Sequence, residues 1–83
     1  MDSLGRVKQA LRDALQLGER ADKLTEGSAL LGGIPEFDSM AVVTVLTLLE
    51  EEFNLQIHDD EVSAETFETV GSLTRFLESK TRP

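Results

Sequence analysis

The sequence predicts an all-α fold, a small four-helix bundle made of three main helices and one short helix. In three separate segments the apolar residues recur three or four positions apart, which is the spacing of an amphipathic helix. The alternating stretch at residues 55–57 is too short to predict a strand. Because 83 residues leave room for one domain, we expect residues 1–83 to share a single core.

The first main helix is expected at about residues 3–17. Its apolar residues follow helical spacing: Leu4, Val7, Leu11 and Leu15. Gly18 comes directly after this run, and glycine is a common residue just past the end of a helix. The sequence therefore predicts that the chain leaves the helix here.

A long loop is expected between the first and second helices, over residues 18–37. Four turn-forming residues interrupt it: Gly27, Gly32, Gly33 and Pro35. Loops of this length in a compact domain are uncommon and often functional. Its apolar residues are too many for a disordered linker, and we expect them to pin the loop across the helices. They are Leu24, Leu30, Leu31, Ile34 and Phe37.

The second main helix is expected at about residues 38–53. Asp38 or Ser39 can cap its beginning, and Asn54 can end it. One face is apolar and would enter the core: Val42, Val45, Leu46, Leu49 and Phe53.

The last third of the chain predicts a short helix at about residues 61–65 and a final helix at about residues 70–80. Phe67, between them, is expected to anchor in the core. The final helix has one apolar side, made of Val70, Leu73, Phe76 and Leu77.

Acidic residues dominate the middle of the chain. The formal net charge is −8, yet residues 24–74 contain eleven acids and no Lys or Arg. This segment repels phosphate backbones, so we expect no nucleic-acid binding, and it favours partners with basic surfaces.

The chain is expected to be a cytoplasmic monomer that does not enter a membrane. No apolar run is long enough to span a bilayer, and the beginning of the sequence lacks the apolar region of a signal peptide. There is no Cys, which excludes disulfides and thiol nucleophiles.

The sequence predicts no enzyme site and no metal site. His58 is the only histidine, so with no cysteine there are too few ligands for zinc. Residues 59–61 are acidic but lack the alternate spacing and central glycine of a calcium loop. Ser39 lacks the Gly-x-Ser-x-Gly context of a hydrolase nucleophile.

Three stretches of the chain resemble the acyl carrier and peptidyl carrier family: Phe37-Asp38-Ser39-Met40 with the apolar helix after it, residues 59–61, and residues 66–73. The resemblance implies a 4'-phosphopantetheine arm attached covalently to Ser39. It also implies that Asp38 helps a phosphopantetheinyl transferase to dock or to hold its metal. Met40 stands where many members have Leu, and belongs to the same attachment motif.

The residue chemistry at Ser39 agrees with this assignment. A serine hydroxyl is a poor nucleophile, so a separate enzyme has to activate it. The start of a helix offers unpaired N–H groups and the positive end of the dipole, which suit a phosphodiester anion. The alternative is that Asp38 and Ser39 are only a capping pair, which is common at helix starts.

The outer face of the second helix is the expected partner-binding surface. Its residues are Met40, Val43, Thr44, Thr47, Glu50 and Glu51. Many family members carry acids near positions 41 and 44, whereas this chain has Ala41 and Thr44 there. We therefore expect docking that relies on apolar contact more than on ion pairs. The alternative is that these exposed residues have no role, since scattered surface apolar residues are normal.

The resemblance implies a carrier of acyl or aminoacyl thioesters in a biosynthetic pathway. Its expected partners are the transferase, an acyl- or aminoacyl-activating ligase and downstream transferases. Two alternatives remain, an unmodified helical interaction module and an aminoacyl or peptidyl carrier rather than a fatty-acyl one. Five residues line the expected interior and either shelter an acyl chain or only form the core: Val42, Leu46, Ile57, Phe67 and Leu73.

Overall fold

The computed structural model describes residues 3–35 and 37–81, so the parts of the predictions at residues 1–2, 36 and 82–83 lie outside the described residues. The chain forms three α-helices, α1 (Ser3–Leu15), α2 (Ser39–Phe53) and α3 (Val70–Thr81), and three short 3₁₀ helices, η1 (Gly18–Lys23), η2 (Asp59–Glu61) and η3 (Ala64–Phe67). No strand occurs within these ranges. The all-α class with three main helices is confirmed.

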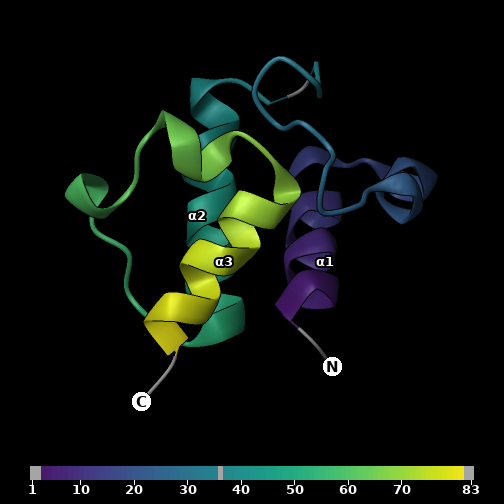
Figure 1. Cartoon of the computed structure of the whole chain (residues 1–83). Helices are drawn as coiled ribbons and strands as arrows, with labels where there is room; N and C mark the ends of the chain where they lie inside the picture. Colours follow the sequence, from purple (N-terminus) through teal and green to yellow (C-terminus); the bar gives the residue numbers. More distant parts are fainter. Residues whose placement is uncertain (1–2, 36, 82–83) are drawn as a thin grey trace.

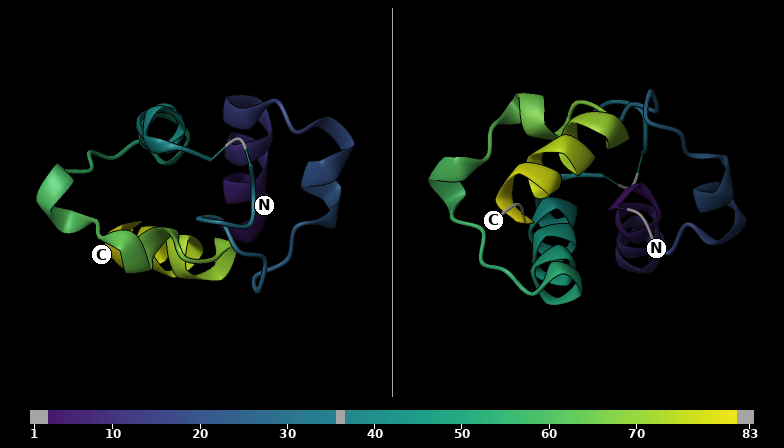
Figure 2. Two further views of the ribbon diagram at one scale, coloured as in Figure 1. Left: turned by 90° about the horizontal axis from the view of Figure 1, so that it is seen from above. Right: turned by 60° about the horizontal axis from the view of Figure 1, so that its bottom comes forward.

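Helix α1 packs against both α2 and α3, and the three surround one core (Figure 1). The long connection that contains η1 passes on the side of α1 away from α2, as the view from above shows (Figure 2). η2 and η3 lie at the opposite edge of the molecule, beside α2 and α3.

Within the three α-helices, the buried apolar residues are those that repeat at helical spacing. The three α-helices contribute Val7, Ala10, Leu11, Leu15, Val45, Leu49, Phe53, Val70, Leu73 and Leu77. Several of these side chains have no exposed surface at all, and burying one stabilises the fold by about 1.5–3 kcal/mol. Val42, Leu46 and Phe76, also expected on the inner faces, are half-buried against this core. The apolar periodicity therefore identified the inward side of each main helix.

Helix α1 ends at Leu15, at the last residue of its apolar repeat and two residues before the end predicted from Gly18. Gln16 takes a left-handed conformation with φ 54°, and the N–H of Leu17 donates to the carbonyl of Arg12 at 3.1 Å. This closure satisfies a free carbonyl of the last turn and lets Leu17 fold back onto the core. Leu17 is thus buried although it lies outside the helix. Its position in the sequence would fit a buried residue inside the helix equally well.

The connection predicted as an irregular loop over residues 18–37 contains the 3₁₀ helix η1. Within η1 one side chain, Ala21, is buried. Of the five apolar residues expected to pin the connection, Leu30, Ile34 and Phe37 are buried and Leu24 is half-buried. The fifth prediction is wrong, because Leu31 is 43% exposed and holds the loop through its backbone N–H instead.

The short helix predicted at residues 61–65 is replaced by η2 and η3, which overlap its two ends and leave residues 62–63 outside any helix. Ser63 is extended, with φ −141° and ψ 177°, and so interrupts any helix through it. Its N–H donates to the hydroxyl of Thr66 at 3.1 Å, which fixes a new start at Ala64. A serine that caps and therefore breaks a helix explains the difference. Phe67, the expected anchor, is buried at the end of η3.

Candidate functional site

Asp38 begins α2 as its N-cap. Its backbone is extended, with φ −115° and ψ −173°, and its Oδ1 accepts a hydrogen bond from the N–H of Ala41 at 2.9 Å. Its carbonyl accepts from the N–H of Val42 at 3.0 Å. Of the two residues that the sequence offered as a cap, Asp38 is the one that bonds the first turn, which leaves the side chain of Ser39 unused.

Ser39 is the first residue of α2 and lies on the surface. No described residue gives its hydroxyl a hydrogen-bond partner. Helix geometry also leaves the N–H groups of Ser39 and Met40 without an acceptor inside the helix. The start of α2 therefore presents a solvent-exposed hydroxyl next to free backbone donors.

Two buried residues, Phe37 before Ser39 and Val45 after it, anchor the exposed start of α2 to the core. Phe37 is 5% exposed, and its ring centroid lies 5.8 Å from that of Phe67 in η3. Its N–H donates to the carbonyl of the buried Ile34 at 3.0 Å. On the helical side Val45 is fully buried. Between these two anchors, residues 38–40 lie on the surface.

A short backbone ladder fixes the connection that leads to Ser39. Residues 26–31 run beside residues 67–71, with an isolated antiparallel bridge between Ala29 and Thr69. Four hydrogen bonds of 2.8–3.2 Å join the segments: Leu30 to Glu68, Leu31 to Phe67, Val70 to Ser28 and Gly71 to Glu26. The position of the serine thus depends on a segment about thirty residues after it in the chain.

Gly33 allows the connection to fold tightly just before Ser39. A Cβ atom at this residue would lie 2.4 Å from the carbonyl oxygen of Ala29 and 2.6 Å from its Cβ. The N–H of Gly33 donates to the carbonyl of Leu30 at 3.3 Å. No other residue type fits this approach without moving the backbone, so the glycine helps to shape the path into α2.

The expected partner-binding face of α2 points into solvent. Met40 is 77% exposed and Val43 is 63% exposed. Thr44 and Thr47 are exposed as well, but their hydroxyls donate to the carbonyls of Met40 and Val43, at 3.3 and 3.0 Å.

The two glutamates assigned to this face differ from each other. Glu51 is exposed, whereas Glu50 is half-buried and its Oε2 accepts from the N–H of Ile57 at 2.7 Å. Both line a recess of about 430 Å³ at the end of α2, together with Thr47, Asn54, Leu55 and Gln56. Glu50 therefore holds the segment after the helix as well as facing the recess.

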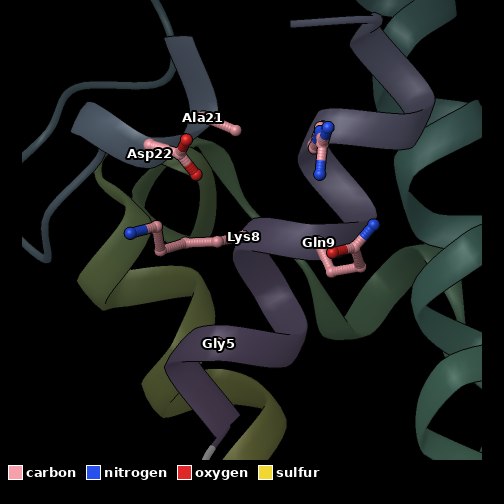
Figure 3. Close-up of a pocket in the computed structure, with 6 residues that line it drawn as sticks. Gly5, Lys8, Gln9, Ala21 and Asp22 are labelled. Carbon is pink, nitrogen blue, oxygen red and sulfur yellow. The ribbon is translucent and has the colours of Figure 1, made fainter. Parts of the chain in front are cut away.

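Two further recesses are lined by other elements. One, of about 230 Å³, lies between α1 and η1, where Lys8 extends toward Asp22 (Figure 3). The other, of about 360 Å³, is lined by residues of α1 and α3 and by Glu26. Neither includes a residue of α2, and both have mixed charged linings, so neither belongs to the site at Ser39.

The remaining residues considered from the sequence lie apart from Ser39. His58 is exposed in the segment after α2. Among the side chains that the structure describes, in residues 3–35, 37–58 and 60–81, no three acidic or histidine side chains gather as metal ligands would. None of the helices in the same ranges has the length and hydropathy that a bilayer crossing requires.

The five residues that were expected to line the interior belong to the core or its edge. Leu73 and Phe67 are buried, while Val42, Leu46 and Ile57 are half-buried and pack against the core. None of the five lines any of the three recesses.

Three features of the site were not anticipated from the sequence. They are the inward hydroxyls of Thr44 and Thr47, the bond from Ile57 to Glu50, and the ladder between residues 26–31 and 67–71. The first two depend on rotamers and the third on long-range pairing, none of which leaves a periodic signal.

Comparison with known proteins agrees with this geometry. The family model described as the phosphopantetheine attachment site matches residues 5–77. The chain is also similar to a holo acyl carrier protein from Nitrosomonas europaea, solved in solution by NMR. The two share 57% sequence identity over 96% of each chain, with a TM-score of 0.89. The chain therefore belongs to the phosphopantetheine-binding family of acyl carrier proteins, which carry a covalent 4'-phosphopantetheine and are carriers rather than enzymes.

Proposed function

We propose that Ser39 is the attachment residue, and that the chain carries acyl or aminoacyl groups as thioesters for the enzymes of a biosynthetic pathway. The observation that carries this proposal is the exposed hydroxyl at the first position of α2, free of described hydrogen-bond partners, in a member of this family.

The surroundings of Ser39 fit a phosphodiester. The N–H groups of Ser39 and Met40 have no acceptor within the helix, and the dipole of α2 places partial positive charge at this end. Asp38 is the acid that precedes the serine in the sequence, and its Oδ1 is already bonded to the N–H of Ala41. Ser39 would hold the arm and the first turn of α2 would face its phosphate.

The 4'-phosphopantetheine supplies a terminal thiol on which acyl groups are carried as thioesters. The residues of this chain have a positioning role. The buried Phe37 and Val45 hold the start of α2 so that Ser39 faces solvent. Tethering then keeps the cargo at a high effective concentration near each partner enzyme.

The family implies a phosphopantetheinyl transferase and biosynthetic enzymes as partners. We propose that an acyl- or aminoacyl-activating ligase and downstream transferases bind the same exposed face of α2. In this scheme Asp38 assists the transferase directly, in addition to capping the helix. Because residues 24–74 contain acidic side chains and no Lys or Arg, partners with basic surfaces are favoured.

The proposal is tested by intact-mass spectrometry after incubation with a broad-specificity phosphopantetheinyl transferase and coenzyme A. The wild-type chain is expected to gain the mass of one arm, and Ser39→Ala is expected to gain nothing. Ser63→Ala is the control, since it changes a serine outside α2 and is expected to accept the arm. A folded wild-type chain that stays unmodified would favour the unmodified interaction module instead.

A further inference from the structure

Helix α2 ends on a run of acids that oppose its own dipole. Its last turn carries Glu50, Glu51 and Glu52, and residues 39–53 contain no basic side chain. The carbonyl end of a helix carries partial negative charge, so acids are unfavourable there and a cation is favourable. The last carbonyls also lack donors within the helix. The end of α2 therefore needs a positively charged donor from another part of the chain.

Arg6 of α1 supplies this donor. The beginning of α1 and the end of α2 lie at the same end of the molecule (Figure 1). The Nη2 of Arg6 donates to the backbone carbonyl of Glu52, and its Nε lies 3.4 Å from Oε1 of the same residue. The guanidinium carbon lies 4.1 Å from the centroid of the Phe53 ring, which is a cation–π contact. One side chain of α1 thus contacts a carbonyl, an acid and an aromatic ring in the last turn of α2.

The ion pair is the weakest of these three contacts. The side chains of Arg6 and Glu52 are 33% and 44% exposed, and exposed ion pairs contribute little to stability. The other two contacts involve a carbonyl at the helix end and the ring of the buried Phe53. They use the planar fork and the flat face of the guanidinium together, which a lysine does not have. The arrangement is therefore specific to arginine.

The same turn also holds the segment that follows α2. The carbonyl of Glu50 accepts a hydrogen bond from the N–H of Leu55 at 3.0 Å. Its Oε2 accepts from the N–H of Ile57 at 2.7 Å. Since both bonds need Glu50 in its helical position, the order of residues 55–57 depends on the turn that Arg6 contacts.

We propose that Arg6 caps the C-terminal end of α2 from the neighbouring helix, and that α1 thereby controls the order of residues 55–57. The last turn of α2 is then stable only while the beginning of α1 lies beside it. A shift of α1 at this end would loosen the segment after α2, whereas the first turn keeps its own cap at Asp38. This contact belongs to the folded chain with or without an arm, so the proposal does not rest on the proposed function.

The test is amide hydrogen exchange of the full chain, followed by NMR, with Arg6→Met as the main variant. Methionine keeps an apolar stem near α2 and removes the guanidinium. We expect the amides of Leu55 and Ile57 to exchange about tenfold faster than in the wild type, since opening the last turn no longer breaks the cap. The amide of Ala41, bonded in the first turn, should be unchanged because its opening leaves the last turn in place.

Three further variants separate the cap from its alternatives. Arg12→Met removes another arginine of α1, one that lines the recess against η1, and should leave all three amides unchanged. Arg6→Lys keeps the charge without the planar fork, and Leu55 and Ile57 should still exchange at least about threefold faster than in the wild type. Glu52→Gln removes only the exposed ion pair and should change exchange by less than about threefold.

Three results would overturn the proposal. The first is unchanged exchange at Leu55 and Ile57 in Arg6→Met. The second is an equal acceleration at Ala41, because the arginine would then stabilise the whole fold rather than one turn. The third is an effect of Glu52→Gln as large as that of Arg6→Met, which would reduce the contact to an ion pair. If Arg6→Met does not fold, Arg6→Lys provides the same comparison of amides.

Discussion

At the scale of single residues, Asp38 combines a structural contact with a proposed functional one. Its Oδ1 bonds the N–H of Ala41, and its place next to Ser39 puts the other oxygen within reach of an enzyme at the serine. Both contacts use the carboxylate, but only the cap is satisfied equally well by a neutral oxygen. Substitution can therefore separate them.

We expect Asp38→Ala to lose about 1 kcal/mol of unfolding free energy, because the N–H of Ala41 loses its acceptor. In a domain of this size the melting temperature would fall by about 4–8 °C. Asp38→Asn keeps an oxygen for the cap and should melt close to the wild type, yet accept the arm at least tenfold more slowly. Thermal circular dichroism and the transfer assay check the two parts. Equal transfer rates for Asn and Asp would assign Asp38 to capping alone.

At the scale of elements, the connection before α2 depends on close backbone contacts more than on its apolar content. Leu31 is exposed, yet its N–H bonds Phe67, and Gly33 lies against Ala29 with no room for a side chain. Gly27, in the same connection, has open space around it. The two glycines therefore make a matched pair for testing whether tight packing shapes this segment.

Gly33→Ala is expected to destabilise the fold by about 1–3 kcal/mol, because the new methyl group overlaps the backbone of Ala29. Gly27→Ala meets no atom within 4 Å and should leave the unfolding free energy within about 0.5 kcal/mol of the wild type or slightly above it. Urea unfolding measures both. Similar stabilities for the two variants would show that the turn at residue 33 adapts freely.

At the scale of the whole molecule, a bond between Glu61 of η2 and Lys80 of α3 closes the edge opposite to η1. The Lys80 hydrogen bond lowers the pKa of the Glu61 carboxyl, and the N–H of His58, which donates to Glu61 at 3.2 Å, lowers it further. A depressed carboxyl pKa stabilises the fold above the unfolded value of about 4.3, and this contribution is lost as pH falls through the lower folded value.

We expect Lys80→Gln to be less stable than the wild type at neutral pH, with the difference shrinking as pH drops below about 4. The pKa of Glu61, followed by carboxyl NMR titration, should rise toward its ordinary value but stay depressed by the His58 N–H. Lys23→Gln removes an exposed lysine of η1 and should leave this titration unchanged. An unaltered Glu61 titration in Lys80→Gln would contradict the proposed cause.

Much of this architecture was predictable because its main signal is periodic. Val45, Leu49 and Phe53 repeat along one side of α2, and they are buried. The same pattern placed Met40 and Val43 on the outer side. The cap at Asp38 is a local signal of the same kind, since its partner is only three residues away.

The features that the sequence did not reveal depend on single bonds or on distant pairing. η1 contains one buried apolar residue, Ala21, and so has no period to read. A serine occurs both at the start of a helix and where a helix is interrupted. At Ser63, the hydrogen bond from its N–H to the hydroxyl of Thr66 decides between the two. The backbone hydrogen bond from Leu30 to Glu68 joins two distant segments, and neither segment has a sequence pattern that predicts this pairing.

That ladder has a consequence for the order in which the protein is completed in the cell. A ribosome makes residues 26–39 well before residues 67–71, and until the later segment emerges the earlier one lacks its backbone partners. The loop that presents the serine therefore takes its final shape only after residues 67–71 have been made. Under the proposed function, an enzyme that acts on Ser39 meets the finished loop only after residues 67–71 have emerged from the ribosome.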